Sequence, residues 1–234
     1  MGDSHALWRQ LLPVHNSGAP VTSPPGNQSI EAATVFIVDD DDAICEGLCN
    51  LLESVGIKAE RFGSAEEFIA TWTQASPGCL MLDARLPGMT GVEFQDQLIR
   101  SGIRIPIIFM TAHGDVPMVR KVLKAGAVEF LTKPFEKEEM LVAIRHAFQM
   151  DAARRNERRD LNEIQSRLDL LTPREREVME RVTSGLLNKQ IAAELSLSEI
   201  TVKLHRRHLL EKMKAESLAD LVKMTQRIKA TRVE

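Results

Sequence analysis

Two short apolar runs in this chain each end in aspartate. Val35–Val38 leads into Asp39–Asp42, and Cys79–Leu82 leads into Asp83. If the two runs are neighbouring strands of a parallel sheet, their carboxyl ends meet at one edge, where such sheets bind ligands. Carboxylates that lie close together repel one another unless a cation neutralises them, and Mg²⁺ prefers such oxygen ligands. An aspartate beside Mg²⁺ can act as a nucleophile toward phosphorus, so the pattern indicates phosphoryl transfer onto Asp83.

Strand-like and helix-like segments alternate between residues 34 and 150. Short apolar runs predict strands that are buried on both faces of a sheet, and Lys58–Phe62 is a weaker candidate with the character of an edge strand. Five strands alternating with five helices predict a doubly wound α/β domain with a five-stranded parallel sheet. The other strands are predicted at Val35–Val38, Cys79–Leu82, Ile105–Met110 and Ala127–Leu131, and the helices are predicted around Ile44–Val55, Phe68–Trp72, Val92–Ile99, Val119–Leu123 and Leu141–Phe148.

The pattern after residue 150 is entirely helical. Residues 151–168 are dense in charge and contain neither Gly nor Pro, so we expect a helical linker there rather than a solvated spacer. Thr172–Glu175 has the residues of a capping box with Pro at the first helical position, and Asn188 and Ser198 can cap two further helices. The second and third helices with the turn between them predict a helix-turn-helix, and a last helix around Leu218–Met224 completes an all-α, four-helix domain.

Composition supports a division of the chain into parts with different tasks. A tail rich in Pro and Gly (1–31) precedes the α/β domain (32–150), which is followed by the linker (151–168) and the all-α domain (169–234). The formal charge is −7 over residues 1–150, +1 over residues 151–168 and +3 over residues 169–234. An acidic first part and a basic last part indicate two domains with separate partners.

Several classes of protein are disfavoured by what the chain lacks. No apolar run is long enough to span a bilayer, and no basic segment followed by an apolar core marks a secretory signal, so we expect a cytoplasmic protein that does not contact the membrane. The three cysteines lack the spacing of a metal site and are expected to be reduced structural thiols. A redox role for Cys45 and Cys49 is the alternative, although i,i+4 helix positions suit a disulfide poorly.

Two further groups fall at predicted strand ends. Thr111 follows Ile107–Met110, and Lys133 follows the run that ends at Leu131. A hydroxyl and an ammonium at the same sheet edge as the carboxylates can bind phosphoryl oxygens. Taken singly, a strand-terminal Thr is usually a cap, a Lys is usually solvated and an acidic run is usually a helix start. Their joint occurrence at ordered strand ends favours the functional interpretation.

Four motifs in this order resemble the receiver domain of two-component response regulators. They are Val38–Asp41, Leu82–Gly91, Met110–His113 and Leu131–Phe135. The resemblance implies that Asp83 is the phosphoacceptor and that Asp39 and Asp40 form an acidic pocket for Mg²⁺. The direct ligands of the metal would be Asp40, Asp83 and the main-chain carbonyl of Arg85.

The same resemblance gives roles to residues on the other strands. Thr111 would follow the phosphoryl group, Lys133 would pair with it, and Phe130 would occupy the aromatic switch position. The Lys133–Pro134 bond would be cis, which is affordable for an X–Pro bond. An aspartyl phosphatase of the haloacid-dehalogenase type is the enzymatic alternative. That chemistry needs a second Asp two residues after the nucleophile, where this chain has Arg85, so we expect a regulator rather than an enzyme.

The last part of the chain resembles the LuxR-type DNA-binding domain. The resemblance rests on Leu171–Val178, Gly185–Ala192 and Leu197–His205. Together with the receiver motifs it is the arrangement of the NarL/FixJ family, and His113–Met118 and Lys124–Val128 lean toward FixJ-like members. The resemblance covers about residues 34–225, and the N-terminal tail falls outside it.

The third helix of the all-α part is basic, as expected of a helix that enters the major groove of DNA. Lys203, Leu204 and Arg207 face the same way on successive turns, so we assign base-edge contacts to them. Phosphate contacts, which position the protein without specifying sequence, are assigned to Asn188, Lys189, Thr201, Arg206 and His208. The predicted core positions are Val178, Ile191, Leu195, Val202 and Leu209.

These expectations combine into one hypothesis of function. A sensor histidine kinase would phosphorylate Asp83, and the pocket would move Thr111 and Phe130. This would alter the face built by helix 4 and strand 5 and promote homodimerisation of the receiver. The helical domain would then bind promoter DNA as paired half-sites and act on RNA polymerase. The alternative is a phosphorylation-switched adaptor whose helical part binds a protein, and salt-dependent binding to duplex DNA separates the two.

Overall fold

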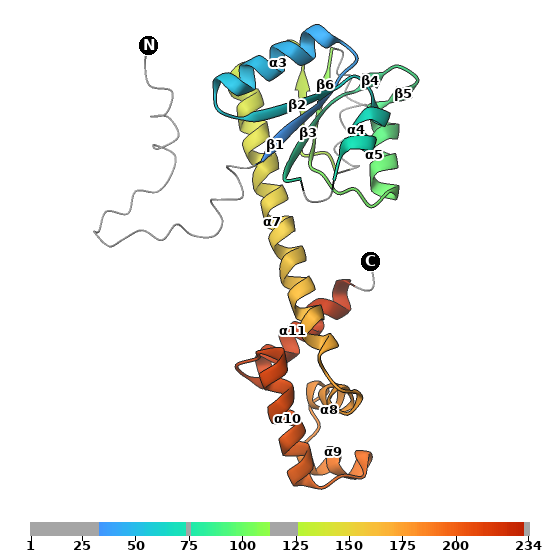
Figure 1. Cartoon of the computed structure of the whole chain (residues 1–234), viewed down its shortest axis with the longest axis vertical. Coiled ribbons are helices and arrows are strands. Elements are labelled where there is room, and N and C mark those ends of the chain that lie inside the picture. The colour runs from blue at the N-terminus through green and yellow to red at the C-terminus, as the bar shows by residue number, and fades with distance from the viewer. Residues whose placement is uncertain (1–32, 74–75, 113–125, 232–234) are drawn as a thin grey trace, which may run out of the picture. The chain divides into compact units, whose positions relative to one another are not determined.

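The computed structural model describes residues 33–73, 76–112 and 126–231 (Figure 1). The chain divides into two compact units, Met1–Arg154 and Arg155–Glu234, and each is described by itself. Three predicted features lie outside the described residues: the tail 1–31, the helix around Val119–Leu123, and the His113–Met118 motif with most of the segment that follows it. Within the described part of the chain, no helix is both long enough and apolar enough to cross a membrane.

A five-stranded parallel sheet forms the centre of the first unit. Its strands are β1 (Thr34–Val38), β2 (Lys58–Phe62), β3 (Gly78–Asp83), β6 (Ile107–Thr111) and β7 (Glu129–Thr132), in the spatial order β2-β1-β3-β6-β7. The expected edge strand is confirmed, because β2 pairs with β1 alone and only Phe62 of its residues is buried. β6 begins two residues later than predicted, since Pro106 has no N–H to donate to the ladder and contributes only its carbonyl, which accepts from Leu80.

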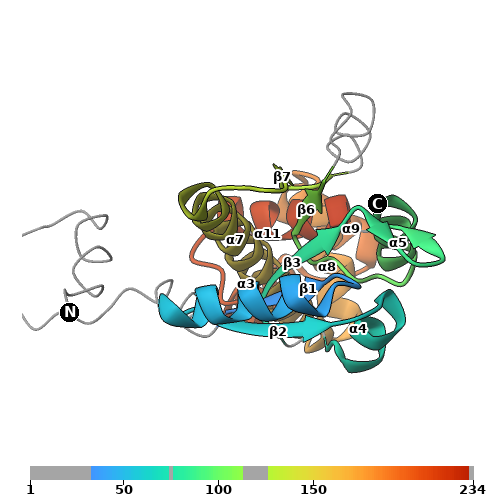
Figure 2. The ribbon, with the colours of Figure 1, turned by 90° about the horizontal axis from the view of Figure 1, so that it is seen from above.

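Helices cover both faces of the sheet (Figure 2). Strand side chains alternate between the faces, so Val35, Ile37 and their neighbours pack against α3 (Asp42–Ser54) and the first turns of α7 (Lys137–Asp169). Phe36, Val38 and their neighbours pack against α4 (Ala65–Thr71) and α5 (Gly91–Arg100). Aromatic rings fill much of this second layer, where Phe68 lies edge-on to Phe36, Phe62 and Phe94. A two-stranded hairpin, β4 (Arg85–Leu86) and β5 (Met89–Thr90), joins β3 to α5.

The segment after the sheet is one continuous helix. α7 runs from Lys137 to Asp169 and passes through residues 151–168, where the sequence predicted a helical linker. Its first part belongs to the first unit and its last part to the second. Ile164, near its C-terminal end, is buried in the core of the second unit.

Four helices follow in the second unit, as predicted: α8 (Pro173–Thr183), α9 (Asn188–Leu195), α10 (Glu199–Met213) and α11 (Leu218–Thr231). Both halves of the capping box are formed at Thr172, and Ser198 caps α10 by accepting from the Thr201 N–H. The prediction that Asn188 caps α9 is wrong. The helix begins at Asn188, and the N-cap is Leu187, whose N–H donates to Gln190 Oε1 at 2.8 Å.

The core of the second unit confirms the apolar pattern. Val178, Ile191, Val202 and Leu209 are fully buried, and Leu195 is 9% exposed. Ser196 adopts a left-handed conformation (φ 53°) that ends α9 and turns the chain into α10. Helix α9, this turn and α10 form the predicted helix-turn-helix.

Candidate functional site

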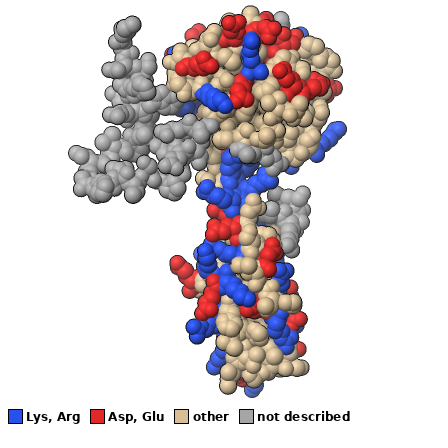
Figure 3. Space-filling view, viewed as in Figure 1, with Lys and Arg blue, Asp and Glu red and all other residues tan. Residues whose placement is uncertain are grey.

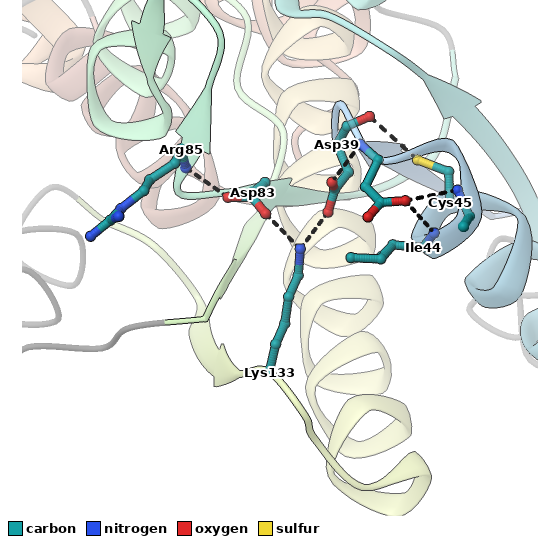
Figure 4. Close-up of polar contacts among 8 residues, drawn as sticks. Asp39, Ile44, Cys45, Asp83, Arg85 and Lys133 are labelled. Carbon is teal, nitrogen blue, oxygen red and sulfur yellow. Dashed lines mark hydrogen bonds and ion pairs between the residues drawn. The ribbon is translucent and has the colours of Figure 1, made fainter.

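Three charged side chains meet at the carboxyl edge of the sheet (Figure 4). Asp39 follows β1, Asp83 ends β3 and Lys133 follows β7. The Lys133 Nζ atom donates to Asp39 Oδ2 and to Asp83 Oδ2, each at 2.5 Å. The register that pairs Val38 with Leu82 places the two aspartates side by side, as the parallel-sheet prediction required.

Strand alternation explains why these side chains converge. Asp39 continues the series Val35, Ile37, and Asp83 continues the series Cys79, Met81, both of which pack on the α3 and α7 face of the sheet. Lys133 stands two residues beyond Leu131, which lies in the same cluster. In each of the three strands, the next residue on this face of the sheet therefore points to the same place, although the strands are far apart in the sequence.

Backbone groups hold the second oxygen of each carboxylate. Asp39 Oδ1 accepts from the Asp41 N–H at 3.0 Å, and Asp41 in turn caps α3 by accepting from the N–H groups of Ala43 and Ile44. Asp83 Oδ1 accepts from the Arg85 N–H at 2.7 Å, while the Arg85 side chain points away from the pocket (Figure 4). Each carboxylate is thus fixed on one side by the main chain and presents its other oxygen to the shared ammonium.

The pocket is partly shielded from solvent, and this shifts its charges. The Asp39 side chain is 2% exposed and the Asp83 side chain 14% exposed. Burial raises the pKa of Asp39, and the hydrogen bonds from Lys133 and Asp41 offset part of that effect. Burial opposes the charge on Lys133, but its hydrogen bonds to Asp39 and Asp83 outweigh burial and raise the pKa of the ammonium. The ammonium therefore stays charged between the carboxylates.

The donor set at this edge fits a hard divalent cation. The carboxylates of Asp39 and Asp83 face the single ammonium of Lys133, which leaves the cluster with one excess negative charge, and Asp40 follows Asp39 in the chain. Asp40 is exposed, and among the described residues no three His, Cys, Asp or Glu side chains are already gathered around a common point. Mg²⁺ commonly keeps several waters and needs only one or two carboxylates, so this arrangement suits it.

Thr111 and Phe130 lie on the strands beside the pocket. Thr111 ends β6, is 1% exposed, and its carbonyl accepts from the Lys133 N–H at 2.7 Å. Phe130 lies on β7, opposite Phe109, and is half-buried against the aromatic layer. The Lys133–Pro134 bond is cis, as the resemblance implied.

Gly91, to which no role was assigned from the sequence, lies directly against the backbone of Asp83. A Cβ atom on Gly91 would lie 2.6 Å from the Asp83 carbonyl oxygen and 2.9 Å from the Phe109 ring. Gly91 also donates its N–H to the Ala84 carbonyl at 3.0 Å. After the β4–β5 hairpin the chain therefore lies against the end of β3. The signal available in the sequence was a glycine at the first position of a helix, after the Thr90 of a capping box.

The cysteines are placed as structural thiols. Cys79 lies in β3 and is fully buried, and burial strongly raises the pKa of its thiol. Burial raises the pKa of Cys45 to about 11, and burial also raises the pKa of Cys49. Thiolates are the reactive form of cysteine, so these shifts argue against the redox role for Cys45 and Cys49.

Helix α10 presents the predicted recognition face to solvent. Lys203, Leu204 and Arg207 are exposed, whereas Val202 and Leu209 point into the core. On the face shown in Figure 3, basic side chains of the second unit are interspersed with acidic ones. Among these cations Arg207 is partnered, because its Nε donates to Glu211 Oε1 at 2.8 Å, a bond that raises the pKa of the guanidinium.

The predicted phosphate anchors divide into two groups. Lys189 and His208 are exposed, whereas Arg206 and Asn188 are half-buried and bonded to each other, Arg206 Nη1 to Asn188 Oδ1 at 2.7 Å. The Asn188–Arg206 bond links the start of α9 to the middle of α10. Thr201 is half-buried, and its hydroxyl lies 2.8 Å from the Ser198 hydroxyl at the helix start.

Lys212 contributes to the basic count of α10, but it is only partly exposed and its ammonium pairs with a buried carboxylate. Its Nζ donates to Glu175 Oε2 at 2.7 Å, and the Glu175 side chain is only 4% exposed. The same oxygen accepts from the Thr172 N–H at 2.8 Å. Burial alone would raise the pKa of Glu175, but Lys212 and the hydrogen bonds from Thr172 outweigh it and lower the pKa.

Comparisons with known proteins agree with both units. Residues 35–145 match the family described as response regulator receiver domain, and residues 169–225 match bacterial regulatory proteins of the luxR family. Response regulator protein TodT of Pseudomonas putida is 44% identical over 224 residues, which is 96% of this chain and 97% of that protein. Nodulation protein W of Bradyrhizobium diazoefficiens is 47% identical over 194 residues, which is 83% of this chain and 86% of that protein.

Solved structures show the same relationship. The response regulator StyR is 45% identical, with a TM-score of 0.75 over 84% of this chain and 99% of that one. Full-length FixJ from B. japonicum is 35% identical, with a TM-score of 0.51 over 85% of this chain and 98% of that one. The chain therefore belongs to the DNA-binding response regulators of the NarL/FixJ type, which join a receiver domain to a LuxR-type helix-turn-helix domain.

Proposed function

We propose that Asp83 is the phosphoacceptor through which a sensor histidine kinase controls this regulator. The observation that carries the proposal is the pairing of Asp83 Oδ2 with Lys133 Nζ at 2.5 Å, in a pocket where Asp83 keeps 14% of its side chain exposed. An incoming phosphoryl donor can reach that oxygen, and the neighbouring ammonium is placed to neutralise charge that develops on the transferred group.

The transfer itself requires few protein groups. The Asp83 oxygen forms a bond to phosphorus while the bond between phosphorus and its donor breaks. Lys133 can leave the Asp83 oxygen for a phosphoryl oxygen without leaving the pocket, because Asp39 holds it as well. Thr111, on the neighbouring strand, is the hydroxyl that would follow the phosphoryl group, and Phe130 is the ring that would respond to its movement.

Mg²⁺ is the cofactor that this pocket would take. Asp39, Asp40, Asp83 and the main-chain carbonyl of Arg85 would hold it, and it would supply positive charge for the phosphoryl oxygens. The excess of carboxylates over ammonium groups supports this assignment. Asp40 lies at the exposed rim, so it would bind from the solvent side of the site.

For the second unit we infer that α10 reads bases and that its surroundings bind phosphates. Lys203, Leu204 and Arg207 would be the base contacts, and the anchors would be Asn188, Lys189, Thr201, Arg206 and His208. We take residues 32–150 as the receiver, 151–168 as the linker and 169–234 as the DNA-binding domain. Phosphorylation would favour a homodimer that binds paired half-sites and contacts RNA polymerase.

A mass measurement tests the phosphoacceptor. The full-length chain, incubated with a small phosphodonor and Mg²⁺, should gain one phosphoryl group that is stable in acid and lost in base. Asp83→Asn should gain none, and Asp40→Ala should react far more slowly. Glu60→Gln on the β2 edge is the matched control, since that carboxylate lies outside the pocket. Labelling of Asp83→Asn equal to that of the unmodified chain would overturn the assignment.

Binding curves on operator and random duplexes test the division of the DNA contacts. Lys203→Ala should cost about 1–3 kcal/mol on the operator and less on random DNA, because a groove contact depends on which base is present. Lys189→Ala should weaken both duplexes similarly and lower the salt slope by about one unit, because a phosphate contact releases counterions whatever the sequence. Equal losses on both duplexes for both variants would contradict the division.

A further inference from the structure

The N-terminal half of α10 exposes two apolar side chains one helical turn apart. Ile200 is 79% exposed and Leu204 is 50% exposed. Single exposed apolar residues are ordinary on protein surfaces. These two are neighbours on one face, since residues at i and i+4 lie above one another on a helix. A β-branched residue that is largely exposed adds little to the stability of a helix, so the fold itself gives little reason for an isoleucine at position 200.

Cations lie on the same face. Positions 200, 203, 204 and 207 follow the i, i+3, i+4, i+7 spacing, so Lys203 and Arg207 flank the apolar pair. Both cations are exposed, and the Arg207 side chain is 76% exposed. Val202 and Leu209 on the opposite face are fully buried. The exposed face therefore combines apolar and positively charged groups, and a partner must offer matching apolar groups and negative charge together.

Double-stranded DNA offers this combination in its major groove. Phosphates line both edges of the groove, and the 5-methyl group of thymine is the apolar feature on its floor. We propose that Ile200 joins Leu204 in a single apolar surface that selects thymine methyl groups, so that the operator half-site carries two closely spaced thymines. The proposal rests on the assignment of α10 as the recognition helix.

The helix geometry sets the spacing of the two thymines. Ile200 and Leu204 are four residues apart, which is about 6 Å along the helix axis. Base pairs are stacked about 3.4 Å apart, so the two side chains reach positions one or two base-pair steps from each other. Neither side chain has a hydrogen-bonding group. Their selectivity must therefore come from the methyl groups and not from the polar edges of the bases.

Replacing thymine with uracil isolates this effect, because the exchange removes the methyl group and leaves the base-pairing edge unchanged. An operator is first selected from a random duplex library with the full-length chain, treated with a small phosphodonor. Each thymine of the half-site is then replaced by uracil in turn, and affinity is measured by fluorescence anisotropy. At two positions the exchange should weaken binding by about fourfold, the effect of burying one methyl group.

The variants assign each position to a side chain. Ile200→Ala should bind thymine and uracil duplexes equally at one of the two positions and keep the discrimination at the other, where Leu204→Ala should lose it. Leu170→Ala is the matched control, because Leu170 is 65% exposed but lies before α8, and it should keep both discriminations. Circular dichroism should show all three variants folded, since none of these side chains is buried.

Three other outcomes would contradict the proposal, each at a different step. Equal affinity of the unmodified chain for thymine and uracil duplexes at every position overturns the proposal while leaving DNA binding intact. If Ile200→Ala still prefers thymine to uracil in full at both positions, the role of Ile200 is overturned and Leu204 remains a reader. Failure of the phosphorylated chain to select or bind any duplex overturns the recognition-helix assignment itself, and this proposal with it.

Discussion

The carboxylate of Asp151 on α7 accepts a hydrogen bond from the backbone N–H of Gly78 at the start of β3 (Oδ2 to N, 3.1 Å). The two residues are 73 positions apart, and Asp151 is 2% exposed. Arg154 pairs with the other carboxylate oxygen and remains partly exposed. β3 is thus held by α7 at the end opposite Asp83. Glycine is required at position 78, because a Cβ atom there would lie 2.0 Å from the Thr34 carbonyl oxygen.

Removing the Asp151 carboxylate should destabilise the receiver. Asp151→Ala leaves the buried Gly78 N–H without its acceptor, which costs about 1–3 kcal/mol, and Asp151→Asn should cost less because its amide oxygen can still accept. Urea unfolding followed by tryptophan fluorescence measures the loss. Glu157→Ala, at an exposed position on the same helix, should stay within about 0.5 kcal/mol of the unmodified chain. Equal stability of Asp151→Ala and Glu157→Ala would show that the buried bond contributes nothing.

A single methyl group at position 91 should impair phosphorylation. Gly91→Ala brings its Cβ within 2.6 Å of the Asp83 carbonyl oxygen, so the backbone that carries the phosphoacceptor must shift. Overpacking of this kind typically costs about 1–3 kcal/mol of stability. A displacement of about 1 Å at the reacting group can slow a reaction on the order of 100-fold. The measurement is the initial rate of labelling by a small phosphodonor.

Gly47→Ala is the control for that experiment. Gly47 lies in α3, and a Cβ atom there meets nothing within 4 Å. Alanine at this helix position should stabilise the chain by about 0.5–1 kcal/mol and leave the labelling rate unchanged. Labelling of Gly91→Ala at the rate of Gly47→Ala would mean that the strand end tolerates the displacement.

The pocket was predictable because its residues follow a simple rule. Asp39, Asp83 and Lys133 each follow an apolar strand, and parallel strands bring such positions to one edge. The tight approach of Gly91 to Asp83 was not predictable, because it depends on the path of the hairpin between β3 and α5. Nor did the sequence reveal that Asp151 reaches Gly78. Periodicity marks which face a residue occupies, whereas such long-range contacts depend on how the elements pack.

The helical part shows a similar limit. The capping residues Thr172 and Ser198 were predictable from local chemistry. Asn188 has the same preference for helix starts, but its side-chain oxygen accepts a hydrogen bond from Arg206, 18 residues later. The N-cap is Leu187, whose N–H donates to the side chain of Gln190. A tertiary hydrogen bond therefore outweighed a local one and moved the cap by one residue.

The stability of the helical domain should depend on pH through Glu175. Its pKa in the folded chain lies below the ordinary value of 4.5, because Lys212 and Thr172 stabilise the carboxylate more than burial opposes it. A lowered folded pKa contributes stability that is complete above the unfolded pKa and is lost as pH falls through the folded pKa. Glu175→Gln should therefore be less stable than the unmodified chain at pH 7, and the difference should shrink as pH falls below 4.5.

Thermal unfolding followed by circular dichroism at 222 nm, between pH 7 and pH 3, measures this difference. Glu177→Gln is the control, because Glu177 pairs with Arg174 at the surface and exposed pairs contribute little. If the difference in thermal stability between Glu175→Gln and the unmodified chain stays constant down to pH 3, the charge on Glu175 is not responsible for it.

Glu211 should restrain DNA binding by holding Arg207. The carboxylate accepts from Arg207 Nε at 2.8 Å, and both side chains are largely exposed, so the pair opens at little cost. Glu211 also places a negative charge on the face that approaches the phosphates. Glu211→Gln should therefore strengthen operator binding by about threefold at low salt, with a smaller gain at high salt, where charges are screened. Anisotropy titrations across a salt series give both values.

The two contributions of Glu211 can be separated in an Arg207→Ala background. If Glu211 acts by holding Arg207, Glu211→Gln should gain less on the operator once the arginine is gone, because no guanidinium remains to be released. If it acts only by repelling phosphates, the gain should be the same with and without Arg207, on operator and random duplexes alike. Glu180→Gln makes the same change of charge on α8, away from the recognition face, and should leave both affinities close to those of the unmodified chain. A gain from Glu180→Gln equal to that from Glu211→Gln would show that net charge alone is responsible, and that the Arg207–Glu211 pair does not restrain binding.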